Sequence, residues 1–250
     1  MKDEKFQIKL NVQIGESLDN LKTETYSVDV DKKMVVLDAV HELQATQLPE
    51  LAVRWNCKAG KCGSCSAEVN GKPKLMCMSK LSDYNLKEPI SIRPMKTFPL
   101  IKDLVTDVSW NYEVNKRIKP YNHPNSSEYI TMQQIDVDRV QEFRKCIECF
   151  LCQNVCHILR DHDLKDKFVG PRFLLRLASL NMHPLDTENR LGDIKDEFGL
   201  GYCNITKCCT EVCPEIIPIT DEAIIPLKER VVDEFYDPIK WFLRKLFPKK

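Results

Sequence analysis

The stretch Arg54-Trp55-Asn56-Cys57-Lys58-Ala59-Gly60-Lys61-Cys62-Gly63-Ser64-Cys65 carries three cysteines in the spacing C-x4-C-x2-C, and Cys77 follows at a distance. This is the plant-type spacing for a [2Fe–2S] cluster, whose irons are held by four cysteine thiolates. Gly60 and Gly63 support this interpretation. A loop around a cluster brings backbone N–H groups close to sulfide, and glycine permits both positive φ and close approach.

A zinc site is the alternative interpretation of these four cysteines. Zinc ligands usually come as two C-x2-C pairs, and the spacing here fits that pattern poorly. Nearby positive charge suits a cluster that gains an electron, because cations favour its reduced, more negative state. That charge comes from Arg54, Lys58 and Lys61. We therefore predict a [2Fe–2S] cluster held by Cys57, Cys62, Cys65 and Cys77.

The sequence around this loop predicts a small mixed sheet packed on one helix. Apolar and polar residues alternate along residues 6–14 and 26–30, which is the period of a half-buried strand, and residues 34–45 have helical spacing. Asn70-Gly71 suits a tight turn because both residues tolerate positive φ. The remaining predicted elements are the two strands of this hairpin, Ser66–Val69 and Lys74–Met76, and a last strand, Ile90–Arg93.

The second part of the chain is predicted to be mainly helical. Beyond about Phe98 the strand pattern stops, so we divide the chain into domains at residues 1–100 and 101–250. Pro120 and the polar stretch 122–127 indicate a loop. Helical periodicity predicts three helices, over Asp136–Lys145, Pro171–Leu180 and Asp221–Phe235. Together the two parts predict an α+β fold.

The second part also contains a repeated cysteine pattern. Cys146, Cys149, Cys152 and Cys156 are spaced C-x2-C-x2-C-x3-C, and the same spacing later falls on Cys203, Thr206, Cys209 and Cys213. In two-cluster ferredoxins the first three cysteines of such a run hold one cluster and the fourth ligates the other. The exchange predicts a [4Fe–4S] cluster held by Cys146, Cys149, Cys152 and Cys213.

The second cluster of this pair has one ligand fewer. Its cysteines are Cys156, Cys203 and Cys209, and Thr206 stands where a fourth thiolate is expected. Because Thr cannot supply a thiolate, the prediction for this site is a [3Fe–4S] cluster.

Three further residues near these motifs leave alternatives open. Cys208 lies beside Cys209 and is either a substitute ligand or a buried free thiol. We favour the free thiol, because adjacent residues on a tight loop do not easily face one cluster. His157 and His162 follow the first run closely, and we interpret them as hydrogen-bonded or surface residues rather than ligands.

Composition limits the partners and the compartment. The 250 residues include 12 cysteines and balance 37 basic against 37 acidic side chains, so nucleic acid is not an expected partner. We find no apolar run of the roughly 20 residues that span a bilayer and no secretory leader, and we expect a cytoplasmic protein. In a reducing compartment metal ligation explains the cysteines better than disulfides. The basic amphipathic stretch 239–247 suits either a membrane interface or a helix docked on its own domain.

The order of these motifs resembles the iron–sulfur subunit of succinate dehydrogenase and fumarate reductase, and the resemblance covers nearly the whole chain. It rests on the Arg54–Cys65 stretch, on Glu211-Val212-Cys213-Pro214 and on the incomplete second cluster. It implies a β-grasp domain and a helical ferredoxin domain. It also implies two partners, a flavoprotein subunit with covalent FAD and the dicarboxylate site, and a membrane anchor that handles quinone at the cytoplasmic face. His157 and, approximately, Asp161 replace a Pro and a quinone-bonding Trp of the family pattern.

These observations favour an electron-transfer subunit of an enzyme. We find no nucleophile–base pair and no phosphate-binding loop, so we expect single-electron relay between flavin and quinone, with no catalytic residue on this chain. The alternatives are an iron–sulfur subunit of another flavin-linked dehydrogenase or heterodisulfide-reductase-like complex, and a zinc-stabilised interaction module.

Overall fold

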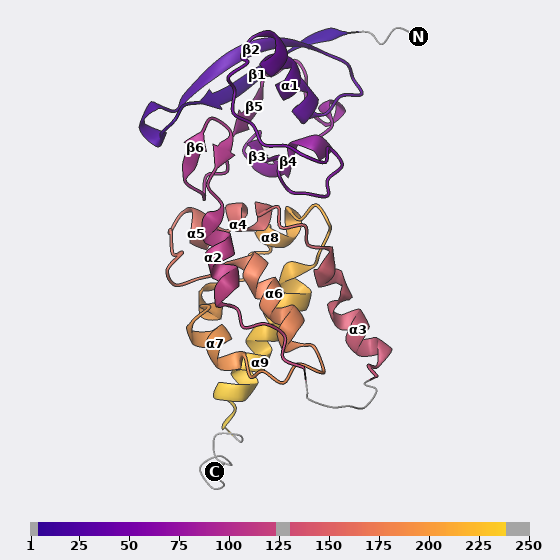
Figure 1. Cartoon of the computed structure of the whole chain (residues 1–250), viewed down its shortest axis with the longest axis vertical. Coiled ribbons are helices and arrows are strands. Elements are labelled where there is room, and N and C mark those ends of the chain that lie inside the picture. Colours follow the sequence, from indigo (N-terminus) through magenta and orange to yellow (C-terminus); the bar gives the residue numbers. More distant parts are fainter. Residues whose placement is uncertain (1–4, 124–130, 239–250) are drawn as a thin grey trace. The chain divides into compact units, whose positions relative to one another are not determined.

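The computed structural model describes residues 5–123 and 131–238, which divide into two compact units (Figure 1). The described residues up to Trp110, together with 147–155, form the first unit, and the described residues of 111–146 and from Cys156 onward form the second. The first unit therefore includes a short segment that lies far along the sequence. The predicted domain division between residues 100 and 101 stays a prediction.

The first unit is built on a five-stranded mixed sheet with the strand order β2-β1-β5-β3-β4. Its strands are β1 (Phe6–Ile14), β2 (Lys22–Val30), β3 (Ser66–Val69), β4 (Lys72–Leu75) and β5 (Ile90–Arg93). β1 is antiparallel to β2 and parallel to β5, so Leu10 pairs with Tyr26 on one side and Ile90 on the other. The predicted mixed sheet is confirmed.

The core of this unit lies between the sheet and helix α1 (Val36–Thr46). Ile8, Leu10 and Val12 are buried on β1, as the alternation predicts. On α1 the buried side chains follow helical spacing, and they are Val36, Leu37, Ala39, Val40 and Leu43. The helix begins where the Val35 N–H donates to Asp38 Oδ2 at 3.1 Å. A mixed sheet holding one helix is the predicted β-grasp arrangement.

The turn between β3 and β4 is the one predicted from Asn70-Gly71, whose φ values are 48° and 76°. The prediction that strands stop beyond Phe98 is wrong, because β6 (Leu100–Lys102) pairs with β7 (Val105–Thr106). These strands are too short to show an alternating pattern. Their turn residue Asp103 accepts hydrogen bonds from Gly15 N at 2.9 Å and Ala52 N at 2.8 Å, which ties the hairpin to the sheet.

The second unit is helical, as predicted. Its helices are α2 (Ser109–Arg117), α3 (Gln134–Gln141), α5 (His157–Arg160), α6 (Pro171–Asn181), α7 (Leu191–Asp196), α8 (Cys208–Glu211) and α9 (Ile225–Phe235), and α2 begins within the first unit. Helix α4 (Leu151–Val155) belongs to the first unit. The three predicted helices are confirmed as α3 with the 3₁₀ turn Glu142–Lys145, as α6, and as α9 preceded by the π-helical turn Ile219–Ile224.

The core of the second unit is centred on α6, which packs on the π-helical turn Ile219–Ile224. Pro171 occupies the first helical turn, where its missing N–H costs nothing, and Gly170 before it has φ 83°. Phe173, Leu174 and Leu177 are buried on this helix. Across the described ranges, no helix combines the length and the apolar composition needed to cross a bilayer. The amphipathic stretch 239–247 lies outside the described residues, as does most of the loop 122–127.

Candidate metal centres

The first candidate centre lies entirely in the first unit, where the β3–β4 hairpin brings Cys65 and Cys77 together. Cys65 directly precedes β3, and Cys77 lies in the 3₁₀ turn Met76–Met78 that follows β4. The Cys77 N–H donates to Cys65 Sγ at 3.5 Å, and both residues are buried. Cys62 is partly exposed and Cys57 is exposed. The hairpin register therefore explains why the fourth cysteine can stand so far along the sequence.

The backbone of the 57–65 loop is folded to present N–H groups to sulfur. The N–H groups of Ala59 and Lys61 both donate to Cys57 Sγ at 3.3 Å. Lys58, Gly60 and Gly63 adopt left-handed conformations with φ of 54°, 67° and 70°. Hydrogen bonds to ligand sulfur are among the features that tune an iron–sulfur cluster. The donor set and the loop conformation fit a [2Fe–2S] cluster.

The thiols of this loop differ in acidity. Burial raises the pKa of Cys65 to about 12. Burial also opposes ionisation of Cys62, but hydrogen bonding by Ser64 and Cys57 outweighs it and lowers the pKa of that thiol to about 7. Because thiolate is the ligand form, iron binding at a thiol with a raised pKa must release a proton.

The predicted cations beside the loop have specific contacts. Arg54 Nη1 donates to the Thr106 carbonyl at 2.9 Å, which connects the loop to the β6–β7 hairpin. Lys58 Nζ lies 4.8 Å from the centre of the Trp55 ring, whose exposed fraction is 48%. Burial, and then the charge of Lys58, lowers the pKa of His41, which packs on Trp55.

The second predicted ligand set draws on both units. Cys149 and Cys152 belong to the first unit, and Cys146 and Cys213 belong to the second. Their grouping around a [4Fe–4S] cluster stays a prediction. The backbone around Cys149 is unusual, because its neighbours Glu148 and Phe150 both have positive φ, at 55° and 59°. Buried Asn154 secures the segment, since its Nδ2 donates to Glu68 Oε1 at 2.9 Å.

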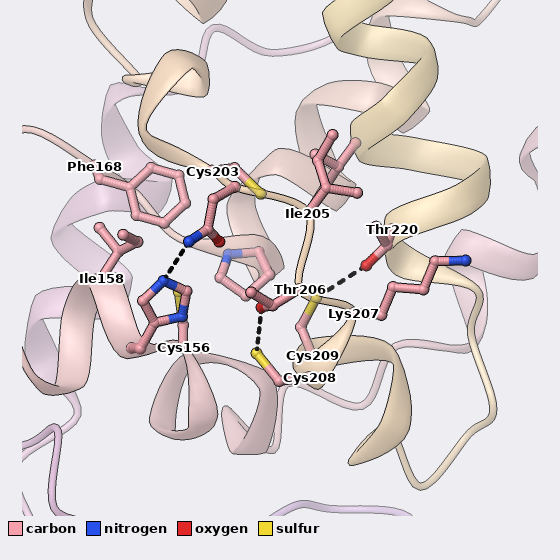
Figure 2. Close-up of a pocket in the computed structure, with 14 residues that line it drawn as sticks. Cys156, Ile158, Phe168, Cys203, Ile205, Thr206, Lys207, Cys208, Cys209 and Thr220 are labelled. Atoms are coloured by element: carbon pink, nitrogen blue, oxygen red, sulfur yellow. Dashed lines mark hydrogen bonds between the residues drawn. The ribbon is translucent and has the colours of Figure 1, made fainter.

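The third candidate centre lies entirely in the second unit, where one pocket brings together Cys156, Cys203 and Cys209 (Figure 2). Cys156 precedes α5, Cys203 follows the 3₁₀ turn Leu200–Tyr202, and Cys209 lies in α8. Burial raises the pKa of Cys156 to about 12 and that of Cys209 to about 11. Segments distant in sequence thus place these three thiols around one cavity. This donor set fits an iron–sulfur cluster.

Thr206 and Cys208 line the same pocket. Figure 2 shows the Thr206 hydroxyl pointing at Cys208 Sγ, and these two atoms are 3.3 Å apart. Cys209 Sγ lies 3.4 Å from Thr220 Oγ1. Cys208 is partly exposed rather than buried, and it faces the cavity together with its neighbour Cys209. The expectation that adjacent residues would not face one site is therefore wrong.

His157 also lines the pocket, and its Nε2 lies 2.8 Å from Asn204 Nδ2. This agrees with the prediction of a hydrogen-bonded residue. His162 contacts the His157 ring edge-on, with centroids 6.3 Å apart. Sequence reasoning did not identify Thr220, Asn204, Asn154 or Glu68, because no local pattern connects them to the cysteines.

All twelve cysteines are free of disulfides. Within the described residues, no three His, Cys, Asp or Glu side chains are arranged to hold a single metal ion. A cluster separates its sulfur ligands by its own width, whereas a single ion draws them together.

Comparison with protein families places this chain in a class. A model described as a 2Fe-2S iron-sulfur cluster binding domain matches residues 8–113, and one described as a 4Fe-4S dicluster domain matches residues 142–217. The chain is thus an iron–sulfur protein with a ferredoxin domain followed by a dicluster domain.

Individual relatives define the family. The chain is 30% identical over 208 residues to the fumarate reductase iron-sulfur subunit of Haemophilus influenzae, covering 76% of this chain and 79% of that protein. It is 33% identical over 178 residues to the succinate dehydrogenase iron-sulfur subunit of Bacillus subtilis, covering 67% and 68%. The chain belongs to the family of succinate dehydrogenase and fumarate reductase iron–sulfur subunits, which are components of oxidoreductase complexes.

Two further similarities concern the extent of the match. The Mycobacterium smegmatis Sdh1 complex in the apo form contains a chain 58% identical to this one, with a TM-score of 0.92, covering 94% of this chain and all of that one. A fumarate reductase (CoM/CoB) subunit of Methanothermobacter marburgensis is 30% identical over 219 residues, or 86% of this chain. This chain spans only 42% of the length of that relative.

Proposed function

We propose that this chain relays single electrons between the FAD of a flavoprotein subunit and quinone at a membrane-anchor subunit, in a succinate:quinone oxidoreductase. The observation that carries the proposal is the arrangement of the cysteines. Four of them share a hairpin and loop in the first unit, and three others converge on one pocket in the second. Family membership supports a role in a succinate dehydrogenase or fumarate reductase complex.

Eleven cysteines hold three clusters in this proposal. The ligands are Cys57, Cys62, Cys65 and Cys77 for [2Fe–2S], Cys146, Cys149, Cys152 and Cys213 for [4Fe–4S], and Cys156, Cys203 and Cys209 for [3Fe–4S]. The clusters supply one-electron carriers, which are needed because a flavin takes up two electrons and passes them on singly. The [2Fe–2S] site faces the flavin, the [4Fe–4S] site lies between, and the [3Fe–4S] site is nearest the quinone.

The residues of the chain hold and insulate these carriers. The N–H groups of Ala59 and Lys61 stabilise negative charge on Cys57 Sγ. Burial of Cys65, Cys156 and Cys209 keeps water from the ligand sulfurs. The electron then leaves through the partners, with the complex attached peripherally to the cytoplasmic face of the membrane through its anchor.

Electron paramagnetic resonance on the anaerobically purified complex, oxidised and then reduced stepwise, tests the cluster content. Oxidised [2Fe–2S] and [4Fe–4S] centres are diamagnetic, so a signal in the oxidised state reports [3Fe–4S]. Two further signals should appear on reduction. An oxidised state without any signal would contradict the three-iron assignment. Co-purification with a flavoprotein that oxidises succinate would separate this function from that of another flavin-linked complex.

A further inference from the structure

The pocket in the second unit contains one thiol more than the proposed [3Fe–4S] cluster uses. Cys156, Cys203, Cys208 and Cys209 all line it. The charge of a thiolate at Cys208 raises the pKa of both Cys156 and Cys209, behind the larger effect of burial, so these sulfurs are electrostatic neighbours. The extra sulfur is therefore at the cluster site rather than on a separate surface.

The extra thiol lies where the cysteine repeat lacks one. Thr206 occupies the missing position in the repeat, and its Oγ1 is 3.3 Å from Cys208 Sγ (Figure 2). A contact this short places the sulfur of Cys208 next to the place that a thiolate at position 206 would occupy. The position of a ligand two residues away is thus compensated in space.

The local backbone explains how Cys208 reaches this place. Ile205 and Lys207 have positive φ, at 60° and 64°. This conformation is rare for a β-branched residue such as Ile205, and strained residues persist where the surrounding structure holds them. The two turns alternate with Thr206 and Cys208, and both of these side chains face the pocket. Helix α8 then begins at Cys208, so Cys209 also faces the cavity.

We propose that Cys208 is a fourth thiolate ligand available to this cluster, so that the site takes up a fourth iron when the cluster is reduced and ferrous iron is present. The inference rests on the proposed function, in that it requires a cluster held by Cys156, Cys203 and Cys209. It makes the site interconvertible between a three-iron and a four-iron form. Iron supply would then control the potential of this carrier.

The chemical step balances without a further reactant. The relay supplies one electron to the three-iron cluster. One Fe²⁺ then binds to three sulfides of the cluster, and the Cys208 S–H bond breaks as an Fe–S bond forms. The proton goes to solvent, and no other electron is transferred in the uptake.

The test compares the purified complex with its Cys208→Ser variant. Each is reduced with dithionite, incubated anaerobically with ⁵⁷Fe²⁺, freed of excess iron and gently reoxidised. The three-iron resonance is quantified before and after treatment, and Mössbauer spectroscopy measures the ⁵⁷Fe incorporated. We expect the wild-type complex to lose the three-iron resonance and gain one ⁵⁷Fe per chain in a four-iron cluster. Cys208→Ser should retain the resonance and incorporate no ⁵⁷Fe.

Thr206→Val is the matched control. It removes the hydroxyl beside Cys208 and keeps the thiol, so iron uptake should persist if ligation is the role of Cys208. A wild-type three-iron signal that is unchanged by iron, or conversion of Cys208→Ser equal to that of the wild type, would overturn the inference. Absence of any cluster signal from this site in the untreated wild type would instead overturn the proposed function, and the inference with it.

Discussion

Gly63 packs directly against Cys149, such that a Cβ atom added to Gly63 would lie 2.6 Å from the Cα atom of Cys149. Ser66 strengthens this contact, because its Oγ lies 2.8 Å from the Gly63 carbonyl and 2.9 Å from the Cys149 carbonyl. The loop that holds the proposed [2Fe–2S] ligands therefore touches the backbone that carries a proposed [4Fe–4S] ligand. This contact requires a residue without a side chain.

Gly63→Ala should destabilise the first unit and reduce iron retention at Cys149. Gly71→Ala is the matched control, because Gly71 also has positive φ, at 76°, but the nearest atom to its added Cβ would be 3.8 Å away. Both variants carry the left-handed strain of about 1–2 kcal/mol. Only Gly63→Ala adds overpacking, of about 1–3 kcal/mol. Iron content and the thermal unfolding temperature report the difference, and equal losses in the two variants would argue against the packing role.

Asn154→Ala should loosen segment 147–155. The Asn154 side chain accepts from the Thr97 N–H at 3.0 Å and donates to Glu68 Oε1 at 2.9 Å, and all three residues are buried. Each buried polar group left unpaired costs about 1–3 kcal/mol. The variant should therefore lose stability, together with the [4Fe–4S] signal that depends on Cys149 and Cys152.

The control for this variant is Asn11→Ala, which removes an exposed hydrogen bond to Thr25. We expect it to change the unfolding temperature little. An Asn154→Ala protein with wild-type stability and a full [4Fe–4S] signal would show that the buried hydrogen bonds do not secure this segment.

Breaking the Asp186–Arg190 ion pair should destabilise the second unit. Both side chains are 2% exposed, and Arg190 Nε donates to Asp186 Oδ2 at 2.7 Å. Arg190 also donates to the carbonyls of Lys119 and Pro120, both at 2.7 Å. Removing one partner of a buried pair costs about 3–5 kcal/mol, since the other charge remains uncompensated.

The pH at which this is measured matters. Burial opposes ionisation of Asp186, but hydrogen bonds from Arg190 and from the backbone of Asn122 and Glu188 lower its pKa. Its contribution is therefore full above the unfolded pKa of about 3.9 and is lost as the pH falls through the lower folded value. At neutral pH, Asp186→Asn should lower the unfolding temperature far more than Glu113→Gln, which breaks the exposed pair with Lys116. Similar effects of the two variants would contradict the prediction.

Serine substitutions test the assignment of ligands to clusters. Cys77 contacts Cys65 within the first unit, so Cys77→Ser should perturb the [2Fe–2S] signal alone. Cys213→Ser should damage the [4Fe–4S] centre and destabilise the fold around it, because metal binding is coupled to folding. Paramagnetic resonance and iron content of each variant decide the matter, and loss of only the [2Fe–2S] signal in Cys213→Ser would show the assignment to be wrong.

Much of the fold could be predicted because its signals are local. Alternation along β1, helical spacing along α1 and α6, and the Asn70-Gly71 turn each depend on a few neighbouring residues. The β6–β7 hairpin was not predicted, because strands this short have no readable period and are held by distant partners of Asp103.

The sequence by itself determined the cysteine groups and the predicted cluster types, because ligands carried on one loop must follow a spacing that the covalent chain can wrap around a cluster. Only the tertiary structure decided that Cys208 faces the pocket beside Thr206, that Asn154 bonds Glu68, and that Gly63 meets Cys149. Those neighbours come from side-chain directions and from packing between segments far apart in the chain. No spacing rule encodes such contacts, since each depends on how the surrounding core closes.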